Sequence, residues 1–223
     1  MKIDILTLFP NLFTGFLNES IIKRAIDNKK VEINIINFRD YTPLKNGQVD
    51  DTPYGGGAGM LLRCEPIFNC IDKIKTSDSY IVLLTPSGKV FNENIAKEYS
   101  LKKHLIIICG HYEGFDERIK TLVDEEISIG DFVLTGGEVP AMAITDAITR
   151  LIPGVINEES LVDESFNNNL LDYPNYTKPA VYRGLKVPDV LLSGDHNKIN
   201  EYRKKEQVNI TTKRRPDLMK GKK

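Results

Sequence analysis

The chain has 223 residues, of which 41% are hydrophobic and 27% charged, a composition typical of a globular protein that excludes a mostly disordered chain. Its formal charge of -1 hides an uneven distribution, because residues 178–223 contain 13 Lys and Arg against 5 Asp and Glu, which leaves 17 against 26 for residues 1–177. Such a basic segment is typical of a region that binds a polyanion, although a solvated lysine-rich terminus gives the same pattern.

The cysteines and the N-terminus indicate the compartment. Cys64, Cys70 and Cys109 form no C-x-x-C pair, and an odd number of cysteines fits no disulfide framework, so we expect reduced thiols. Asp4 stands where a signal peptide needs an apolar core, and no apolar run reaches the length of a membrane span. These features predict a cytoplasmic protein.

Short β-branched runs alternate with segments of helical periodicity up to about residue 151. We expect strands at residues 3–8, 31–37, 80–84, 105–109 and 126–129, and helices at residues 12–28, 66–74, 92–101, 115–122 and 139–151. Asn92 is suited to cap its helix, and the last helix ends before Pro153. Regular alternation of the two element types predicts an α/β fold with a parallel sheet covered on both faces.

The pattern changes after residue 156. Residues 157–169 are polar and acidic and predict a mobile linker, whereas residues 173–188 contain several prolines. Asp195 is suited to cap a helix that runs through Tyr202, and a basic tail follows. We therefore expect an α/β domain over residues 1–156, a flexible linker over 157–172 and a small basic helical domain over 173–223.

Three glycine-marked loops follow successive expected strands, at residues 85–88, 110–114 and 130–138. Ligands of open parallel α/β sheets lie beyond the carboxyl ends of the strands, so these loops predict a shared pocket, although three tight turns would look the same. Residues 110–146 carry nine acids against two bases, which favours a cationic or zwitterionic ligand over a polyphosphate. A solvated acidic surface is the alternative explanation.

Several common sites are not supported by the sequence. There is no G-x-G-x-x-G, Walker A or G-x-S-x-G motif, and the glycine-rich stretch at residues 51–59 is better interpreted as a flap than as a nucleotide loop. His104, His111 and His196 are scattered without metal-ligand spacing, so we expect no protein-held metal cluster. A Mg²⁺ ion held by one carboxylate would leave no spacing signature, and the need for it is therefore left open.

Taken together, six segments resemble the bacterial tRNA (guanine-N1)-methyltransferases, members of the trefoil-knotted (SPOUT) class of RNA methyltransferases that use S-adenosyl-L-methionine. The matching segments are residues 4–10, 50–60, 110–118, 128–141, 172–179 and 191–194, and they cover the chain in order. The resemblance implies a deep trefoil knot in the sheet domain and a homodimer whose active site needs both subunits. It also implies tRNA as the substrate.

The resemblance further implies the cofactor-binding residues. They are Leu83, Leu84, Thr85, Pro86, Ser87, Gly88, Gly110, Tyr112, Glu113, Gly114, Ile129, Gly130, Asp131, Phe132, Val133, Leu134, Gly136, Gly137 and Pro140. The substrate atom would be N1 of the guanosine 3′ of the anticodon, at position 37. The phosphates of the tRNA would be bound by Lys178, Arg183, Lys198, Arg203, Lys204, Lys205, Arg214 and Arg215.

Guanine N1 carries a proton and needs a general base before it can accept a methyl group. The resemblance points to a linker carboxylate, here Glu164 in place of the family's usual aspartate, with Asp163 as the second candidate. Arg150 matches the family's arginine and would stabilise the charge that develops on O6. Two alternatives remain, namely a knotted methyltransferase for another RNA and a non-catalytic RNA-binding module.

Overall fold

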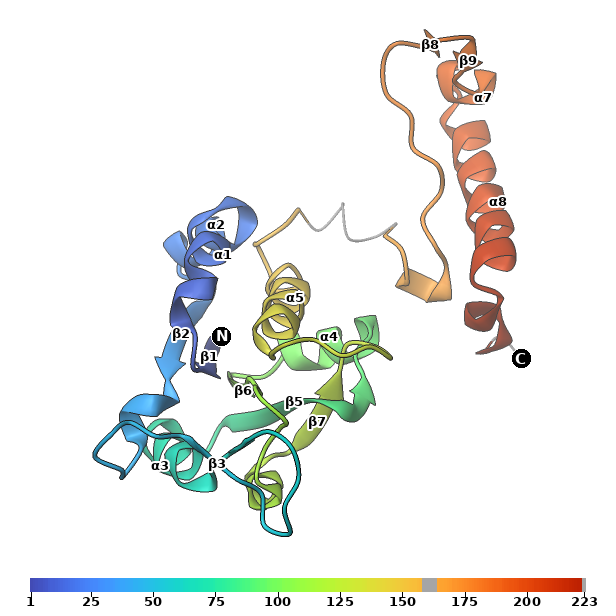
Figure 1. Cartoon of the computed structure of the whole chain (residues 1–223). Coiled ribbons are helices and arrows are strands. Elements are labelled where there is room, and N and C mark those ends of the chain that lie inside the picture. The colour runs from blue at the N-terminus through green and yellow to red at the C-terminus, as the bar shows by residue number, and fades with distance from the viewer. Residues whose placement is uncertain (158–163, 222–223) are drawn as a thin grey trace. The chain divides into compact units, whose positions relative to one another are not determined.

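The computed structural model describes residues 1–157 and 164–221. The chain separates into two compact units, Met1–Ile156 and Asn157–Lys223 (Figure 1). The first six residues after Asn157, which form part of the expected mobile linker and include Asp163, lie outside the described residues. Within the described part of the chain, no helix is long and apolar enough to cross a membrane.

The first unit contains one five-stranded sheet in the order β2-β1-β6-β5-β7, with every neighbouring pair parallel. Its strands are β1 (Lys2–Thr7), β2 (Glu32–Asn37), β5 (Ser79–Val90), β6 (His104–Ile108) and β7 (Glu125–Ser128). The expected parallel α/β class is therefore confirmed. The central β6 is buried throughout, which explains why its sequence is an unbroken apolar run rather than an alternating one.

Helices cover both faces of this sheet. They are α1 (Thr14–Asn18), α2 (Ser20–Asp27), α3 (Cys64–Ile74), α4 (Glu93–Ser100) and α5 (Glu138–Thr149), with short 3-10 segments at Pro10–Phe13, Phe38–Tyr41 and Glu117–Leu122. The Asn92 side chain accepts hydrogen bonds from the backbone N–H groups of Asn94 and Ile95, so the expected cap is confirmed. A small antiparallel pair, β3 (Asp50–Asp51) and β4 (Leu61–Leu62), was not expected.

The expectation of one continuous helix over residues 12–28 is wrong. The backbone of Glu19 is extended, with φ -128° and ψ 156°, and Ser20 has a φ of 54°, so the segment breaks into a 3-10 turn and two short helices. The break lets Phe13 and Ala25 join the same apolar cluster.

The expectation that the strand after Tyr80 ends at Leu84 is also wrong. Leu84 and Lys89 both pair with Ile127 of β7, so the chain leaves the sheet over residues 85–88 and then returns to it. Gly88 permits this return, because a Cβ there would collide with the backbone nitrogen of Ile127. The loop at residues 85–88 is thus an excursion within one strand.

Two apolar clusters lie on opposite faces of the sheet. One is built on Ile3, Ile5, Leu105 and Ile107 and is closed by α2, α4 and α5. The other is built on alternate strand residues such as Leu6, Ile106 and Ile108 and is closed by α3 and the 3-10 segments at Phe38–Tyr41 and Glu117–Leu122. Burial on both faces fixes the register of the strands and hence the positions of the loops at their carboxyl ends.

A polar network holds the opposite, amino-terminal edge of the sheet. The carboxylate of Asp4 is fully buried and lies 2.8 Å from His104 Nε2, while Asn34 Nδ2 donates to its other oxygen. His104 Nδ1 lies 2.7 Å from Ser79 Oγ. Since these contacts link four strands in the described structure, His104 has a structural role, as its position at the start of a strand indicated.

The second unit is built around α8 (His196–Arg214), beside which an extended segment runs. It also contains a small hairpin, β8 (Val181–Tyr182) and β9 (Leu185–Lys186), and the short helix α7 (Asp189–Leu192). The side chain of Asp195 accepts from the N–H of Lys198, which confirms the expected cap. The helix continues beyond Tyr202 to Arg214, so the expectation of an early end followed by a tail is wrong.

Candidate functional site

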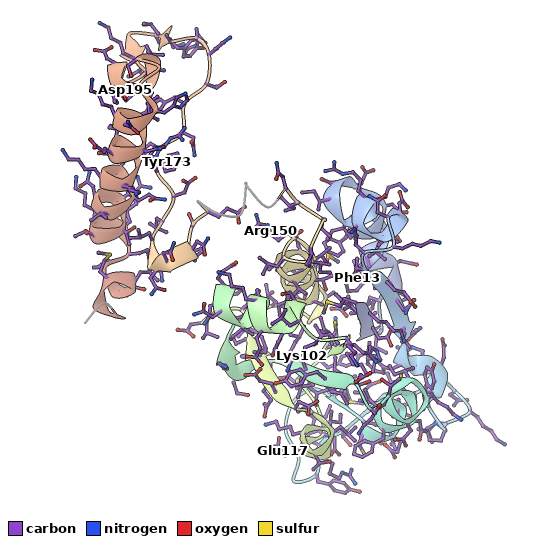
Figure 2. All side chains as sticks on the ribbon, turned by 180° about the vertical axis from the view of Figure 1, so that it is seen from behind. Phe13, Lys102, Glu117, Arg150, Tyr173 and Asp195 are labelled. Atoms are coloured by element: carbon purple, nitrogen blue, oxygen red, sulfur yellow. The ribbon has the colours of Figure 1, made fainter. Side chains whose placement is uncertain are left out.

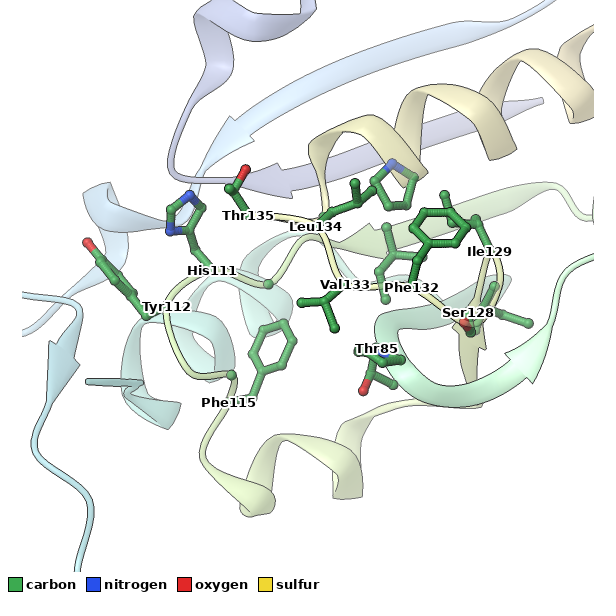
Figure 3. A pocket seen from close by; sticks show the side chains of 18 of the residues that line it. Thr85, His111, Tyr112, Phe115, Ser128, Ile129, Phe132, Val133, Leu134 and Thr135 are labelled. Carbon is green, nitrogen blue, oxygen red and sulfur yellow. The ribbon is translucent and has the colours of Figure 1, made fainter. Parts of the chain in front are cut away.

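The excursion within β5 and the segments that follow β6 and β7 surround a pocket of about 250 Å³, the three-loop pocket (Figure 3). Its lining residues are Leu84, Thr85, Pro86, Gly110, His111, Tyr112, Glu113, Gly114, Phe115, Ile127, Ser128, Ile129, Gly130, Phe132, Val133, Leu134, Thr135, Gly136, Gly137 and Pro140. All three glycine-marked loops contribute, so the expected shared pocket is present. The N-terminus of α5 forms the remaining wall.

The pocket exists because two backbone segments approach one another very closely. A Cβ on Gly137 would lie 2.7 Å from the Cα of Cys109 and 2.8 Å from the backbone nitrogen of Gly110. No side chain other than hydrogen fits there without moving the backbone. The N–H of Gly137 donates to the carbonyl of Gly110 at 2.8 Å, which ties the start of α5 to the end of β6.

Most of the residues expected to bind the cofactor line this pocket, and four do not. Leu83 is fully buried in an apolar cluster, and Ser87, Gly88 and Asp131 lie outside the lining. Sequence reasoning missed His111, Phe115, Ile127, Ser128 and Thr135, which line the pocket. His111 and Thr135 lie within the glycine-marked loops, so taking whole loops instead of motif positions would have included them, whereas Phe115, Ile127 and Ser128 lie outside the loops.

A buried carboxylate stands beside the pocket. Glu138, at the first position of α5, is only 4% exposed, and its Oε1 accepts a hydrogen bond of 2.7 Å from Thr7 Oγ1. The N-terminus of the helix favours the negative charge of this side chain. Burial and the nearby Glu138 raise the pKa of the Cys109 thiol well above its usual value, so this thiol stays protonated and is a poor nucleophile.

His111 forms an aromatic corner of the pocket (Figure 3). Its ring lies 4.7 Å from that of Phe9 and 5.1 Å from that of Tyr112, measured between ring centroids. Its Nδ1 is buried without a hydrogen-bond partner among the described residues. The sequence indicated no separate role for His111, and the structure places it in the lining of the pocket.

The glycine-rich stretch at residues 51–59 is attached to the pocket at one end. The N–H of Glu113 donates to the carbonyl of Met60 at 3.0 Å, and the N–H of Leu62 donates to the carbonyl of Gly114 at 2.9 Å. Tyr54, near the middle of the stretch, is fully exposed, and a Cβ on Gly59 would collide with Glu113. The stretch is thus an exposed loop that contacts a lining residue, an arrangement compatible with the expected flap.

The two expected catalytic residues lie in different units. Arg150 is half-buried at the C-terminal end of α5, and Glu164 is half-buried at the start of the described part of the second unit. Each takes part in interactions within the structure. Asp163, the alternative base, lies outside the described residues. Among the described residues, no three His, Cys, Asp or Glu side chains gather in a way that could hold a metal ion.

The fold and the pocket define a class before any comparison is made. This is an α/β protein with a parallel sheet and a small-ligand pocket at its carboxyl edge, joined to a basic helical unit. The chain belongs to the tRNA (guanine-1)-methyltransferase TrmD family, whose model matches residues 1–221. The resemblance drawn from six sequence segments is thereby confirmed.

Individual relatives agree over nearly the whole chain. The chain is 60% identical to the tRNA (guanine-N(1)-)-methyltransferase of Malacoplasma penetrans over 98% of this chain and 96% of that protein. It is 58% identical to the protein of the same name from Acholeplasma laidlawii, with 98% and 90% covered. For the Staphylococcus carnosus protein of this name the identity is 54%, with 98% and 91% covered.

Proposed function

We propose that this protein transfers a methyl group from S-adenosyl-L-methionine to N1 of the guanosine at position 37 of tRNA. Family membership over residues 1–221 supports the class of reaction. The three-loop pocket supports the place in the fold where the reaction occurs. When bound, S-adenosyl-L-methionine supplies a methyl group on a positively charged sulfonium. The proposal includes two further predictions from the resemblance, namely the trefoil knot in the first unit and the roles of the two domains.

The lining of the three-loop pocket fits such a cofactor. Phe115, Phe132, Val133 and other apolar side chains provide surface for a planar adenine, and the glycine loops expose backbone donors and acceptors. Glu113 is the only carboxylate in the lining, and the lining contains no Lys or Arg. This balance favours a ligand with positive charge and disfavours a polyphosphate.

Two residues of the chain remove the N1 proton of the guanine and stabilise the negative charge that results. Glu164 accepts the N1 proton as general base, which leaves electron density on N1 and O6. Arg150 stabilises the negative charge on O6 with its guanidinium N–H donors. The protonated thiol of Cys109 does not compete as a methyl acceptor, because its pKa is raised.

The position of Arg150 supports a site shared between two subunits. Gly137 precedes the first residue of α5 and Arg150 follows its last, so their Cα atoms lie about 20 Å apart along the helix axis at 1.5 Å per residue. One arginine side chain does not span that distance. We therefore assign Arg150 to the pocket of a second copy in a homodimer.

The basic second unit supports tRNA binding. Its described residues include eleven Lys and Arg, most of them exposed. Two of the residues expected to bind phosphate also form local ion pairs, since Lys198 Nζ lies 3.1 Å from Asp195 and Arg215 Nη2 lies 2.6 Å from Asp217. These pairs are exposed and weak, so phosphates can replace the carboxylates.

The proposal is tested by incubating the protein with unmodified tRNA and labelled S-adenosyl-L-methionine. We expect 1-methylguanosine as the labelled nucleoside, and no label in a matched tRNA in which the guanosine at position 37 is replaced by adenosine. Label at another position or in ribosomal RNA would instead support the alternative knotted methyltransferase. Binding of tRNA without any product would support the non-catalytic module.

Variants assign the catalytic roles. We expect Glu164→Gln to lower kcat about 10²- to 10⁴-fold, since the general base is lost. Arg150→Gln should lower it about 10²- to 10³-fold, since charge on O6 is no longer stabilised. Asp163→Asn is the matched control next to Glu164, and full activity in Glu164→Gln with none in Asp163→Asn would transfer the role of base to Asp163.

Mixing two inactive variants tests the shared site. Arg150→Gln retains its cofactor pocket, and Gly137→Val retains its arginine. If Arg150 serves the partner's pocket, a one-to-one mixture of exchanged subunits regains about a quarter of the activity, because half of the dimers have one complete site out of two. If Arg150 serves its own pocket, the mixture stays inactive.

A further inference from the structure

A second pocket lies within the second unit, and its lining includes neither Glu164 nor Arg150. It measures about 540 Å³ and is called the C-terminal pocket. It lies between the extended segment, α7 and α8. Its lining residues are Tyr173, Pro174, Asn175, Tyr176, Thr177, Lys178, Ala180, Val187, Leu191, Leu192, Ile199 and Arg203.

One wall of this pocket is a stack of two flat groups. The guanidinium carbon of Arg203 lies 4.8 Å from the centre of the Tyr173 ring, so the charge lies over the aromatic face. Tyr173 itself belongs to the extended segment (Figure 2). Tyr176, which also lines the pocket, is 48% exposed. Flat aromatic rings and guanidinium planes are the surfaces on which unstacked nucleobases pack.

The polar groups of the pocket specify the charge of its occupant. The lining contains two cations, Lys178 and Arg203, and no carboxylate. In addition, Nε of Arg203 is buried and donates no hydrogen bond among the described residues. A buried donor without an acceptor is unfavourable, and a ligand with ring nitrogens or carbonyl oxygens would satisfy it.

The apolar groups specify the occupant's shape. Val187, Leu191, Leu192 and Ile199 line the pocket, and Leu192 is 58% exposed, so part of the surface is apolar and accessible. A phosphate would be poorly placed against these side chains. A nucleobase is flat and largely apolar on its faces and carries acceptors on its edge, while its phosphate can remain near the exposed Lys178.

We propose that the C-terminal pocket binds one unstacked nucleobase of the RNA substrate, distinct from the guanine that is methylated. The target guanine is a different nucleotide, because its N1 must lie beside the methyl group of the cofactor, which the proposed function places in the three-loop pocket. The inference rests on the proposed function in that the RNA is tRNA. It adds base recognition to a unit that otherwise contacts only phosphates.

The test compares a pocket variant with a neighbouring surface variant in the full-length protein. We expect Tyr176→Leu to weaken tRNA binding by about 5- to 150-fold while the dependence of the dissociation constant on salt stays the same, because stacking releases no counterions. Tyr176→Phe keeps the ring and should bind normally. Lys204→Ala removes an exposed cation of α8 outside the pocket lining and should reduce the salt slope by about 1.

A second measurement uses the unaltered protein and therefore does not depend on how the variants fold. A series of tRNA anticodon arms, each with one abasic nucleotide, should contain one position other than 37 at which binding falls as it does in Tyr176→Leu. Combining that RNA with Tyr176→Leu should cause no further loss. If no abasic position weakens binding, or if the two losses add, the inference is wrong.

Other outcomes identify a different occupant or a different failure. If Tyr176→Leu leaves tRNA affinity unchanged but alters the oligomeric state in sedimentation, the pocket is an interface between copies of this chain, and the inference is overturned. If the unaltered protein methylates tRNA while every pocket variant binds normally, only the base site fails. If it neither binds nor methylates tRNA, the proposed function itself fails.

Discussion

The two units of the chain differ in the interactions that stabilise each of them internally. The first unit buries two apolar clusters, one on each face of its sheet, and the strands between them are almost completely enclosed. In the described part of the second unit, Thr211 is the only buried residue. The first unit is therefore stabilised mainly by burial of its apolar core. The stability of the second unit depends on hydrogen bonds, on stacking contacts and on ligand binding.

Their pockets differ in the same way. The three-loop pocket lies against a rigid sheet and has one carboxylate and no Lys or Arg, whereas the C-terminal pocket is formed by an extended segment and has two cations and no carboxylate. Within the second unit, the N–H of Leu171 in the extended segment donates to Thr211 Oγ1 of α8 at 2.8 Å. The comparison supports the two proposals, which place a small cofactor in the three-loop pocket and a nucleobase of the RNA in the C-terminal pocket.

The largest expected effect is on the core of the first unit. Ile107 is fully buried in β6, so Ile107→Ala should lower the free energy of unfolding by about 2–5 kcal/mol. The matched change Ile199→Ala, at a half-buried position of α8, should cost less than about 1 kcal/mol. Urea unfolding followed by circular dichroism measures both. Equal losses would contradict the difference between the units.

The next effect concerns the close approach at the three-loop pocket. A Cβ on Gly137 meets the backbone of Cys109 and Gly110, so Gly137→Ala should displace the loops, cost about 1–3 kcal/mol and weaken S-adenosyl-L-methionine binding in calorimetry. Gly15→Ala is the control, because no atom lies within 4 Å of the added Cβ and α1 accepts alanine. Unchanged cofactor affinity in Gly137→Ala would argue against the pocket as the cofactor site.

A smaller effect distinguishes the ligand of the second unit from the ligand of the first. Lys204 and Lys205 are exposed cations on α8, and replacing both with alanine should weaken tRNA binding and reduce the salt slope by about 2. Affinity for S-adenosyl-L-methionine should not change. Filter binding at several salt concentrations, with calorimetry for the cofactor, measures both quantities. Equal losses for the two ligands would show that the units do not act separately.

The smallest effect is electrostatic and lies in the first unit. Burial raises the pKa of Glu125, but hydrogen bonds from Tyr99 and Tyr80 and the ion pair with Lys89 outweigh burial, so the net pKa is lowered. A lowered pKa stabilises the fold above the unfolded value near 4.3, and the contribution is lost as the pH falls through the folded value.

Replacing Glu125 removes this contribution. Glu125→Gln should lower the free energy of unfolding at pH 7 by about 1 kcal/mol or less, and the difference from the unaltered protein should shrink below about pH 4. Thermal unfolding over a pH series measures it. A difference that grows in acid would mean that the carboxyl group is protonated in the folded state at neutral pH.

Much of the site could be predicted because its signals are local. The glycine loops at 85–88, 110–114 and 130–138 were visible as turns after strands, and the caps at Asn92 and Asp195 follow from residue type and position. The lining residue Ile127 was not predictable in this way. Its place depends on Leu84 and Lys89 both pairing with it, which is a long-range contact.

The sequence by itself determined the order of the elements, the parallel α/β class, the glycine-marked loops, the division between an acidic body and a basic end, and the family. These features depend on residue type and spacing along the chain. Only the tertiary structure decided the strand order β2-β1-β6-β5-β7 and the break at Glu19 and Ser20. It also decided that His111 lines the three-loop pocket and that the C-terminal pocket exists. They arise from contacts between residues far apart in sequence, which local periodicity does not encode.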